Sequence, residues 1–151
     1  MKIIKDNIHP ALIKGFRGSI FEETRTVRDF LGIGKSEISS ALPIRSREIL
    51  TWALVDSNNS PIAVLTYQKY TEEVFIKMLY VVPNCRCKGY ASELLSKFCG
   101  EYGNVSMQIN KGNDKMYALV EKLGFIGEGS GRLKEKGIDG KPKWWSRKRE
   151  E

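Results

Sequence analysis

An apolar run, a short polar loop and a second apolar run follow one another between residues 74 and 98, and this order constrains the fold more than any other feature. Residues 74–82 are mostly apolar and predict a buried strand. Residues 91–98 place apolar side chains at helical spacing and predict a helix. The loop between them contains Arg86-x-x-Gly89-x-Ala91. The chain is therefore expected to pass from strand to helix through a tight, glycine-containing turn.

Such a loop turns successive backbone N–H groups, and the open N-terminal end of the helix, toward one point that suits a phosphate or pyrophosphate. Gly89 lets a ligand approach the backbone, Ala91 leaves the helix start uncrowded, and Arg86 and Lys88 add positive charge. The loop has neither the Walker pattern nor the Gly-x-Gly-x-x-Gly pattern of dinucleotide folds. The competing interpretation is an ordinary strand–helix turn whose charges are solvated.

A second segment, residues 113–125, has the features of a short amphipathic helix. Asn113 suits the N-cap, and Asp114 suits the first turn, where a negative charge is favourable. Gly124 suits the C-terminal end, because glycine readily adopts the left-handed conformation found there. The apolar residues at helical spacing are Met116, Leu119, Val120 and Leu123.

Both segments resemble motifs of one known family. The string Val-x-Pro-x-x-Arg-x-x-Gly-x-Ala-x-x-Leu-Leu, from Val81 to Leu95, resembles the acyl-CoA pyrophosphate motif of the GNAT superfamily of N-acetyltransferases. The helix that ends in Glu121-Lys-Leu-Gly-Phe resembles the family's second motif. The two segments occur in the family's order and cover roughly a third of the chain.

The resemblance implies a GNAT-like α+β fold, with a mixed, mostly antiparallel central sheet, a splayed strand pair and helices on both faces. The rest of the chain agrees with this in its pattern of elements, because turn-forming residues at 56–61 and 71–73 separate apolar runs. The expected strands cover residues 2–5, 49–55, 62–70, 74–82, 105–109 and 143–147, with another beginning at 125. The expected helices cover residues 11–31, 36–42, 91–98 and 113–123.

By the same resemblance, acetyl-CoA is the co-substrate and lies where the strands at residues 74–82 and 105–109 splay apart. The pantetheine arm would bond to the backbone of the first strand, and the pyrophosphate would lie on N–H groups of the loop. The amine would attack the thioester directly, so Cys85 and Cys87 beside the loop are not expected to act as nucleophiles. The implied cofactor-binding residues are Val81, Val82, Arg86, Cys87, Lys88, Gly89, Tyr90, Ala91 and Asn113.

The sequence departs from the family pattern at two positions. The motif usually has glycine directly after the arginine, and here Cys87 stands there. Its N–H can still donate, but a non-glycine residue tolerates fewer backbone angles. The tyrosine that often protonates the leaving thiolate in the family is replaced by Val120. Tyr117 lies three residues earlier on the same face and is the candidate acid, displaced by about 4.5 Å along the helix axis; a packing role for its ring is the alternative.

The general base is expected at the turn before the central strand, where relatives often place an acid that deprotonates the amine through water. Glu73 is the candidate, and its neighbour Glu72 shares the turn. The alternative is that both are simply exposed turn residues. Trp144 and Trp145 alternate faces on the last expected strand, so one should be core, and the other either lines an acceptor pocket or packs on the surface.

The chain has 151 residues, of which 41% are hydrophobic, and this suits a single domain spanning residues 1–151. It contains no apolar run long enough to cross a membrane and no secretory signal, so a cytoplasmic enzyme is expected. The three cysteines are expected to be reduced thiols, and the Cys85-x-Cys87 spacing does not suit zinc, so no metal is expected. Either a monomer or a homodimer is compatible with the sequence.

The formal net charge is +7, and many of the basic residues lie between residues 132 and 149. A solubilising surface explains this charge, and so does an anionic acceptor or carrier such as nucleic acid. The main expectation is an N-acetyltransferase that moves an acetyl group from acetyl-CoA to an unknown primary amine, including one linked to nucleic acid. The alternatives are a degenerate member that binds CoA without catalysis, and a nucleic-acid-binding protein whose loop holds backbone phosphate. No helix-turn-helix or RNA-binding signature supports the last of these.

Overall fold

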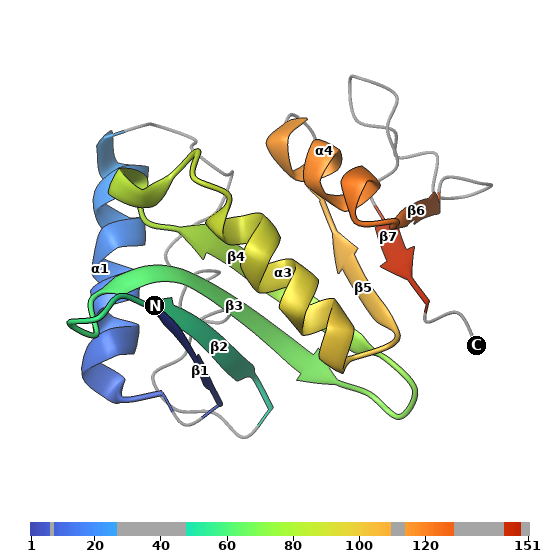
Figure 1. The fold of residues 1–151 in the computed structure, drawn as a ribbon, viewed down its shortest axis with the longest axis horizontal. Coiled ribbons are helices and arrows are strands. Elements are labelled where there is room, and N and C mark those ends of the chain that lie inside the picture. The colour runs from blue at the N-terminus through green and yellow to red at the C-terminus, as the bar shows by residue number, and fades with distance from the viewer. Residues whose placement is uncertain (7, 27–47, 110–113, 129–143, 149–151) are drawn as a thin grey trace. The chain divides into compact units, whose positions relative to one another are not determined.

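The computed structural model of the protein describes residues 1–6, 8–26, 48–109, 114–128 and 144–148 (Figure 1). The chain forms two compact units. The first unit comprises Met1–Gln68 and Lys77–Leu95, and the second comprises Lys69–Ile76 and Ser96–Glu151. The expected helix at residues 36–42 and most of the glycine-rich segment at 127–140 lie outside the described residues.

The strands confirm the expected α+β fold with a mixed, mostly antiparallel sheet. The strand order is β1-β2-β3-β4-β5-β7-β6. Each strand lies within two residues of its expected position. The bounds are β1 Lys2–Lys5, β2 Leu50–Val55, β3 Pro61–Lys69, β4 Val74–Val81, β5 Val105–Gln108, β6 Ile126–Glu128 and β7 Trp144–Arg147.

The core of the first unit forms where the long helix α1 (Pro10–Thr26) packs on the sheet. Ile13, Phe16 and Ile20 recur at helical spacing and are buried. They form one cluster with Ala53 and Val64, which lie on β2 and β3. Burial of this apolar face explains why the helix tolerates two glycines, each of which costs about 1 kcal/mol in a helix interior. The described part of the helix ends at Thr26, and the expected continuation over residues 27–31 lies outside the described residues.

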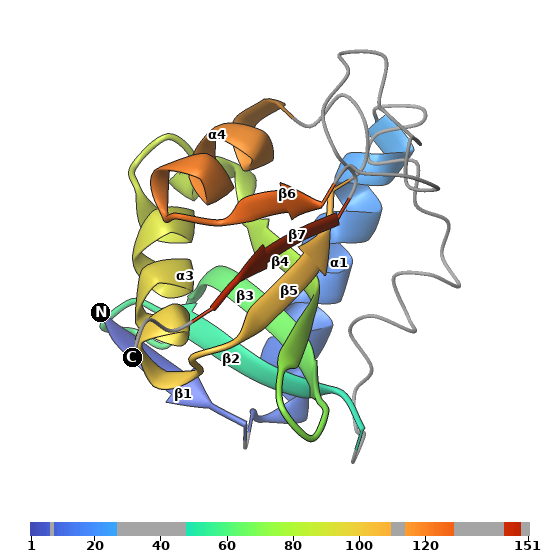
Figure 2. The ribbon, with the colours of Figure 1, turned by 90° about the vertical axis from the view of Figure 1, so that its right-hand side faces the viewer.

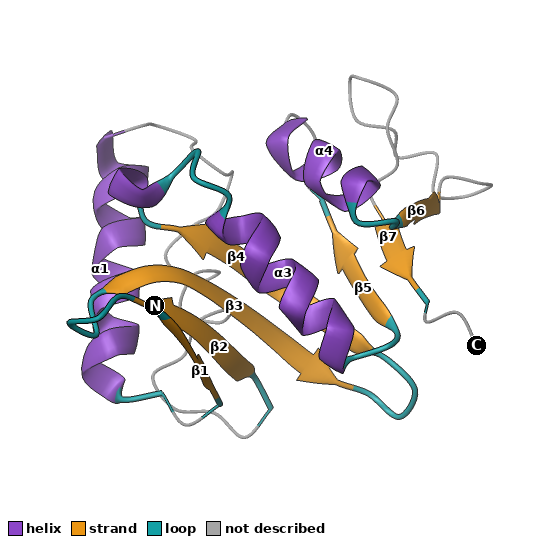
Figure 3. Cartoon of the chain, in the orientation of Figure 1, coloured by secondary structure: helices purple, strands orange, loops and turns teal. Residues whose placement is uncertain are grey.

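The connection from β4 to α3 is the segment that the sequence motif covers. A single helical turn, η2 (Pro83–Cys85), follows β4, and four residues separate this turn from α3 (Tyr90–Glu101) (Figure 3). Proline begins η2 at a position where the missing N–H costs nothing. The helix was expected to end at residue 98, but it continues through Gly100 to Glu101. A single exposed glycine lowers helix stability without forcing a stop.

The second unit is built on antiparallel pairing of β5 with β7 and of β7 with β6, so the three strands run side by side (Figure 2). The helix α4 (Asp114–Lys122) precedes β6 and buries Tyr117 and Val120. Its C-terminal end confirms the expected glycine stop. Gly124 has a φ of 85°, and its N–H donates to the Glu121 carbonyl at 3.2 Å. The N–H of Phe125 donates to the Val120 carbonyl at 2.9 Å, which completes a Schellman motif.

Within the second unit, the start of β4 pairs with β5 in parallel over only three residues. Val74 lies opposite Val105, and Ile76 lies opposite Met107. The pairing ends there, although β4 continues to Val81. This early end of pairing is the feature expected of a splayed strand pair. Among the described residues, no helix is both long enough and apolar enough to cross a membrane.

Candidate cofactor site

Two residues of the loop before α3 adopt the left-handed backbone conformation. Cys87 has a φ of 62° and Gly89 has a φ of 82°. A left-handed residue next to ordinary ones turns neighbouring N–H groups toward the same side, which creates a concave anion site. We call residues 86–91 the phosphate loop. Among the described residues, no backbone carbonyl accepts a hydrogen bond from the N–H of Cys87, Lys88 or Gly89.

The phosphate loop ends at the N-terminus of α3. The Gly89 carbonyl accepts a hydrogen bond from the Glu93 N–H at 3.0 Å, so Gly89 is the N-cap residue. The N–H groups of the first helical turn, beginning at Tyr90, have no intrahelical acceptor, and the helix dipole makes this end partly positive. Cys87, Lys88 and Gly89 are exposed. The loop therefore presents open N–H donors to solvent, as an oxyanion ligand requires.

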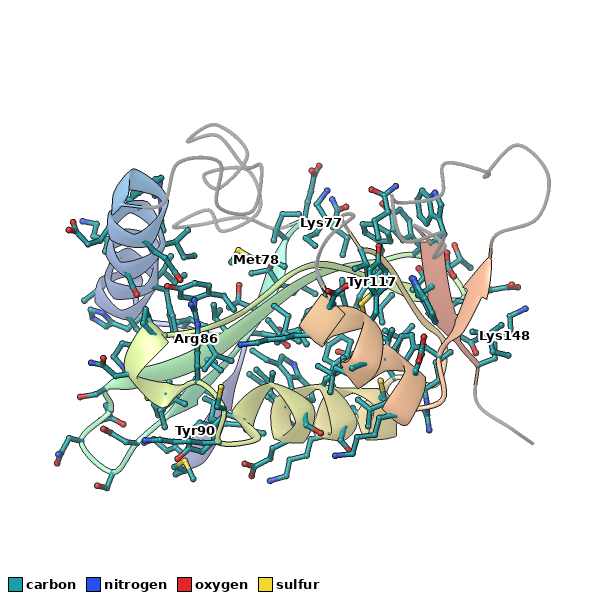
Figure 4. The ribbon with its side chains drawn as sticks, turned by 90° about the horizontal axis from the view of Figure 1, so that it is seen from above. Lys77, Met78, Arg86, Tyr90, Tyr117 and Lys148 are labelled. Carbon is teal, nitrogen blue, oxygen red and sulfur yellow. The ribbon has the colours of Figure 1, made fainter. Side chains whose placement is uncertain are left out.

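Arg86 does not extend into this array of donors. Its guanidinium forms a two-pronged ion pair with Glu23 on α1; Nη1 donates to Glu23 Oε2, and Nη2 donates to Oε1 at 2.6 Å. Its Nε donates to the Val81 carbonyl at 3.0 Å. Figure 4 shows Arg86 between α1 and the turn that precedes α3. The hydrogen bonds that Arg86 donates to Glu23 raise the pKa of Arg86 above its ordinary value.

Tyr80, on β4, belongs to the same group of side chains. Its hydroxyl donates to Glu23 Oε1 at 2.9 Å and lies 3.0 Å from the Ser19 hydroxyl. The Arg86 guanidinium lies 5.4 Å from the centroid of the Tyr80 ring. Burial, partly offset by the Ser19 hydrogen bond, raises the pKa of Tyr80 from 10.0 to about 12. Ser19, Glu23, Tyr80 and Arg86 therefore form one polar cluster, which we call the α1 clamp.

The α1 clamp changes the expected role of the Arg86 charge. Because Glu23 neutralises the guanidinium, Lys88 is the exposed cation on the phosphate loop. The sequence did not indicate Glu23, Ser19 or Tyr80 as parts of the site. Glu23 is separated from Arg86 by 63 residues, and no local pattern connects them.

The β4 residues expected at the pantetheine arm already make backbone hydrogen bonds. The Val82 N–H donates to the Ile62 carbonyl at 2.9 Å, and the Val81 carbonyl accepts from Arg86. A carbonyl oxygen has two lone pairs, so Val81 retains one acceptor position. Both residues are partly exposed.

The candidate catalytic residues belong to the second unit. Tyr117 and Val120 are both fully buried, and the Tyr117 ring lies 6.0 Å from that of Trp145. Glu73 is exposed in the turn before β4, where its carbonyl accepts the Tyr70 N–H at 2.8 Å. Asn113, the remaining expected cofactor residue, lies outside the described residues.

The tryptophan pair divides as expected, with Trp145 buried and Trp144 partly exposed. The Trp144 ring lies 5.8 Å from the ring of Phe75 on β4. All three cysteines are free thiols. In the described part of the chain, no three His, Cys, Asp or Glu side chains gather in a way that could hold a metal ion.

Comparison with known proteins connects this geometry to a family. Residues 22–125 match the model of the Acetyltransferase (GNAT) family, and this range includes the α1 clamp residues from Glu23 on and the whole phosphate loop. Because the match covers more than half of the chain, the protein belongs to the GNAT family of acyl-CoA-dependent N-acetyltransferases. This family uses acetyl-CoA. No curated protein is similar enough in sequence to serve as a relative.

Solved structures share the fold at low sequence identity. Tetrahymena GCN5 superposes with a TM-score of 0.68 at 15% identity, covering 99% of this chain and 95% of that one. The PaiA N-acetyltransferase of Thermoplasma acidophilum, solved with coenzyme A, has a TM-score of 0.67 at 15% identity and covers 98% and 99%. The ribosomal-protein-S18-alanine N-acetyltransferase of Escherichia coli has a TM-score of 0.67 at 15% identity, and the match covers 97% of this chain and 94% of that one.

Proposed function

We propose that the protein transfers an acetyl group from acetyl-CoA to a primary amine by direct attack on the thioester, and that its two units act as one GNAT domain. The observation that carries this proposal is the phosphate loop. Its left-handed Cys87 and Gly89 and its open N–H groups at the start of α3 fit a pyrophosphate. No covalent intermediate is needed, because proximity and charge stabilisation accelerate amine attack.

Each candidate residue has a distinct role in this proposal. The N–H groups of residues 87–91 bind the pyrophosphate, and Lys88 adds an exposed positive charge. Val81 and Val82 lie beside the pantetheine arm, and Asn113 completes the cofactor site. Arg86 contributes by holding the phosphate loop in place, since its own charge is paired with Glu23.

Proton transfer is assigned to two residues of the second unit. Tyr117 protonates the leaving thiolate; its support is its position in the second family motif, one turn before Val120 and on the same buried face. Glu73 removes the amine proton through water; its support is its exposed position directly before the central strand β4. Solvent access lets a carboxylate exchange protons through water.

A second candidate function is CoA binding without catalysis. The observation that favours it is Val120, which is fully buried where relatives often have the acid tyrosine and which cannot donate a proton. Tyr117 is also fully buried, so an acid role requires its hydroxyl to reach the thiolate from inside the core. A protein of this second kind would bind acetyl-CoA but release no thiol when amines are added.

The acceptor amine is left open, because one fold supports many substrates. The names of two structural neighbours illustrate this range, one being a ribosomal-protein-S18-alanine N-acetyltransferase and the other, from Vibrio cholerae, a spermidine N-acetyltransferase. The basic segment between residues 132 and 149 favours an acceptor that is anionic or attached to an anionic molecule. That segment lies mostly outside the described residues.

The experiment that tests the cofactor site compares two glycines with the same backbone conformation. Gly89 and Gly124 have φ angles of 82° and 85°, and at both an added Cβ meets no atom within 4 Å. Alanine at either position should therefore cause similar backbone strain, about 1–2 kcal/mol. Only Gly89→Ala, and more severely Gly89→Val, should weaken CoA binding measured by calorimetry. Equal CoA affinity in folded Gly89→Val and in the wild type would refute the assignment of the phosphate loop.

A further inference from the structure

We propose that Glu23 and Tyr80 are positioning residues for the cofactor site, and that they hold the phosphate loop in its binding conformation through Arg86. This inference rests on the proposed function, because it assigns a role to residues behind the same site. It differs from the simple interpretation of the motif, in which the positive charge of Arg86 contacts the phosphates directly.

The α1 clamp connects three elements that are far apart in sequence, namely α1 through Glu23, β4 through Tyr80 and the phosphate loop through Arg86. Both terminal nitrogens of Arg86 donate hydrogen bonds to Glu23, and its Nε donates one to the Val81 carbonyl. A guanidinium held in this planar, forked manner has a defined position, because its donors have a fixed geometry. The backbone of the loop is therefore tied to two other elements at its first residue.

The Glu23 side chain is 11% exposed, whereas the Arg86 side chain is 32% exposed. A carboxylate that is largely removed from water requires hydrogen-bond donors, and Glu23 receives them from Arg86 and Tyr80. Moving Arg86 toward a phosphate would leave this buried charge without its main partner. The pair therefore favours the conformation in which the loop is docked on α1.

The residue that follows Arg86 has a strained backbone conformation. Cys87 adopts a φ of 62°, which is unfavourable for a residue other than glycine. Such strained conformations persist only where contacts with the surrounding structure hold the backbone in place. Arg86 directly precedes Cys87, so the α1 clamp fixes the chain at the point where the left-handed turn begins. Without the clamp, we expect Cys87 to relax to an ordinary φ and the N–H groups of the loop to diverge.

The two interpretations of Arg86 predict opposite results for Glu23. If Arg86 is a phosphate ligand, removal of Glu23 frees the guanidinium and should leave CoA binding unchanged or tighten it. If Glu23 acts through Arg86 to position the loop, Glu23→Ala should weaken CoA binding by roughly tenfold, within the range observed for residues coupled in one network. Arg86→Gln should weaken binding to a similar extent, and the double variant should be no worse than the single ones.

The experiment measures the affinity of the full chain for CoA and for acetyl-pantetheine, which lacks the pyrophosphate. The variants are Glu23→Ala, Glu23→Gln, Tyr80→Phe and Arg86→Gln, and the matched control is Glu22→Gln on the exposed neighbouring position. A positioning role predicts weaker binding of CoA, unchanged binding of acetyl-pantetheine, and a higher KM for acetyl-CoA with little change in kcat. A general loss of structure would weaken both ligands, and circular dichroism identifies it.

Amide hydrogen exchange of the ligand-free protein gives a second readout that does not depend on the cofactor. Glu23→Gln and Tyr80→Phe keep the size of each side chain. The N–H groups of Arg86 and Glu93, on either side of the loop's open donors, are hydrogen-bonded in the structure. Faster exchange at these two amides, relative to Glu22→Gln, supports the α1 clamp. Unchanged exchange in both variants overturns the inference and leaves the proposed function intact. The same holds if the wild type binds CoA and Glu23→Ala binds it with equal affinity. A wild type that binds no CoA overturns both.

Discussion

Replacing Cys87 with glycine tests the most unusual feature of the cofactor site, a left-handed cysteine at a position where the resembled motif usually has glycine. The φ of 62° is unfavourable for cysteine, at a cost of about 1–2 kcal/mol. Glycine removes this cost but makes the unfolded chain more flexible, which costs about 0.4–1 kcal/mol. The balance predicts that Cys87→Gly stabilises the fold by roughly 0.5–1 kcal/mol. For a chain of this size, that corresponds to a rise in Tm of about 1–4 °C.

Urea and thermal unfolding followed by circular dichroism measure this change. The matched control is Cys87→Ala, which removes the thiol but keeps the Cβ and therefore keeps the strain. Cys87→Ala should be no more stable than the wild type, and CoA affinity should be retained in both variants because the N–H of residue 87 is still present. A Cys87→Gly protein that is less stable than Cys87→Ala would show that the left-handed conformation at this position is not strained.

Three further predictions concern the thiolate acid, alkaline stability and the basic segment. Tyr117→Phe keeps the ring and removes the proton, so turnover should fall by roughly 10²–10⁴-fold, and unchanged turnover would make Tyr117 structural. Burial raises the pKa of the Cys99 thiol from 9.0 to about 11, so between these pH values the folded state keeps a proton that the unfolded chain loses. The free energy of unfolding should therefore decline between pH 9 and 11, by at most about 1.4 kcal/mol per pH unit. Urea unfolding of Cys99→Ala should show a smaller decline, and an identical decline would contradict the assignment. The basic segment should bind RNA or duplex DNA with an affinity that falls steeply as salt is added. Absence of binding at low salt would refute a nucleic-acid role for the segment. Unchanged binding after glutamine replaces Lys141, Lys143 and Lys148 would also refute it.

The fold could be predicted from local patterns because each strand and helix carries its own signal. The β4–loop–α3 segment has an apolar run, a glycine-containing turn and a helical run in sequence, and the structure places all three as expected. Gly124 was likewise predictable, since a helix end that requires a positive φ strongly favours glycine. The expected end of α3 at residue 98 was too early, because Gly100 weakens the helix by an amount that the rest of α3 can offset.

The α1 clamp could not be predicted, since it depends on a contact between residues distant in sequence. Glu23 and Ser19 look like ordinary polar positions on an amphipathic helix, and Tyr80 looks like an ordinary aromatic residue on a strand. Only the folded chain brings them to Arg86. The φ of Cys87 was also not predictable, because the sequence shows that glycine is missing but not whether the backbone keeps the conformation that glycine would adopt.

The most direct test of the proposed function is incubation of the protein with acetyl-CoA and a broad panel of amines, reading free thiol release together with product mass. The panel should include polyamines, peptides with free N-termini or lysines, and amines carried on RNA. The account predicts thiol release that depends on one class of amine, a product heavier by one acetyl group, and loss of both in Gly89→Val. Binding of CoA without thiol release for any amine would support the non-catalytic alternative, and failure to bind CoA at all would contradict the account.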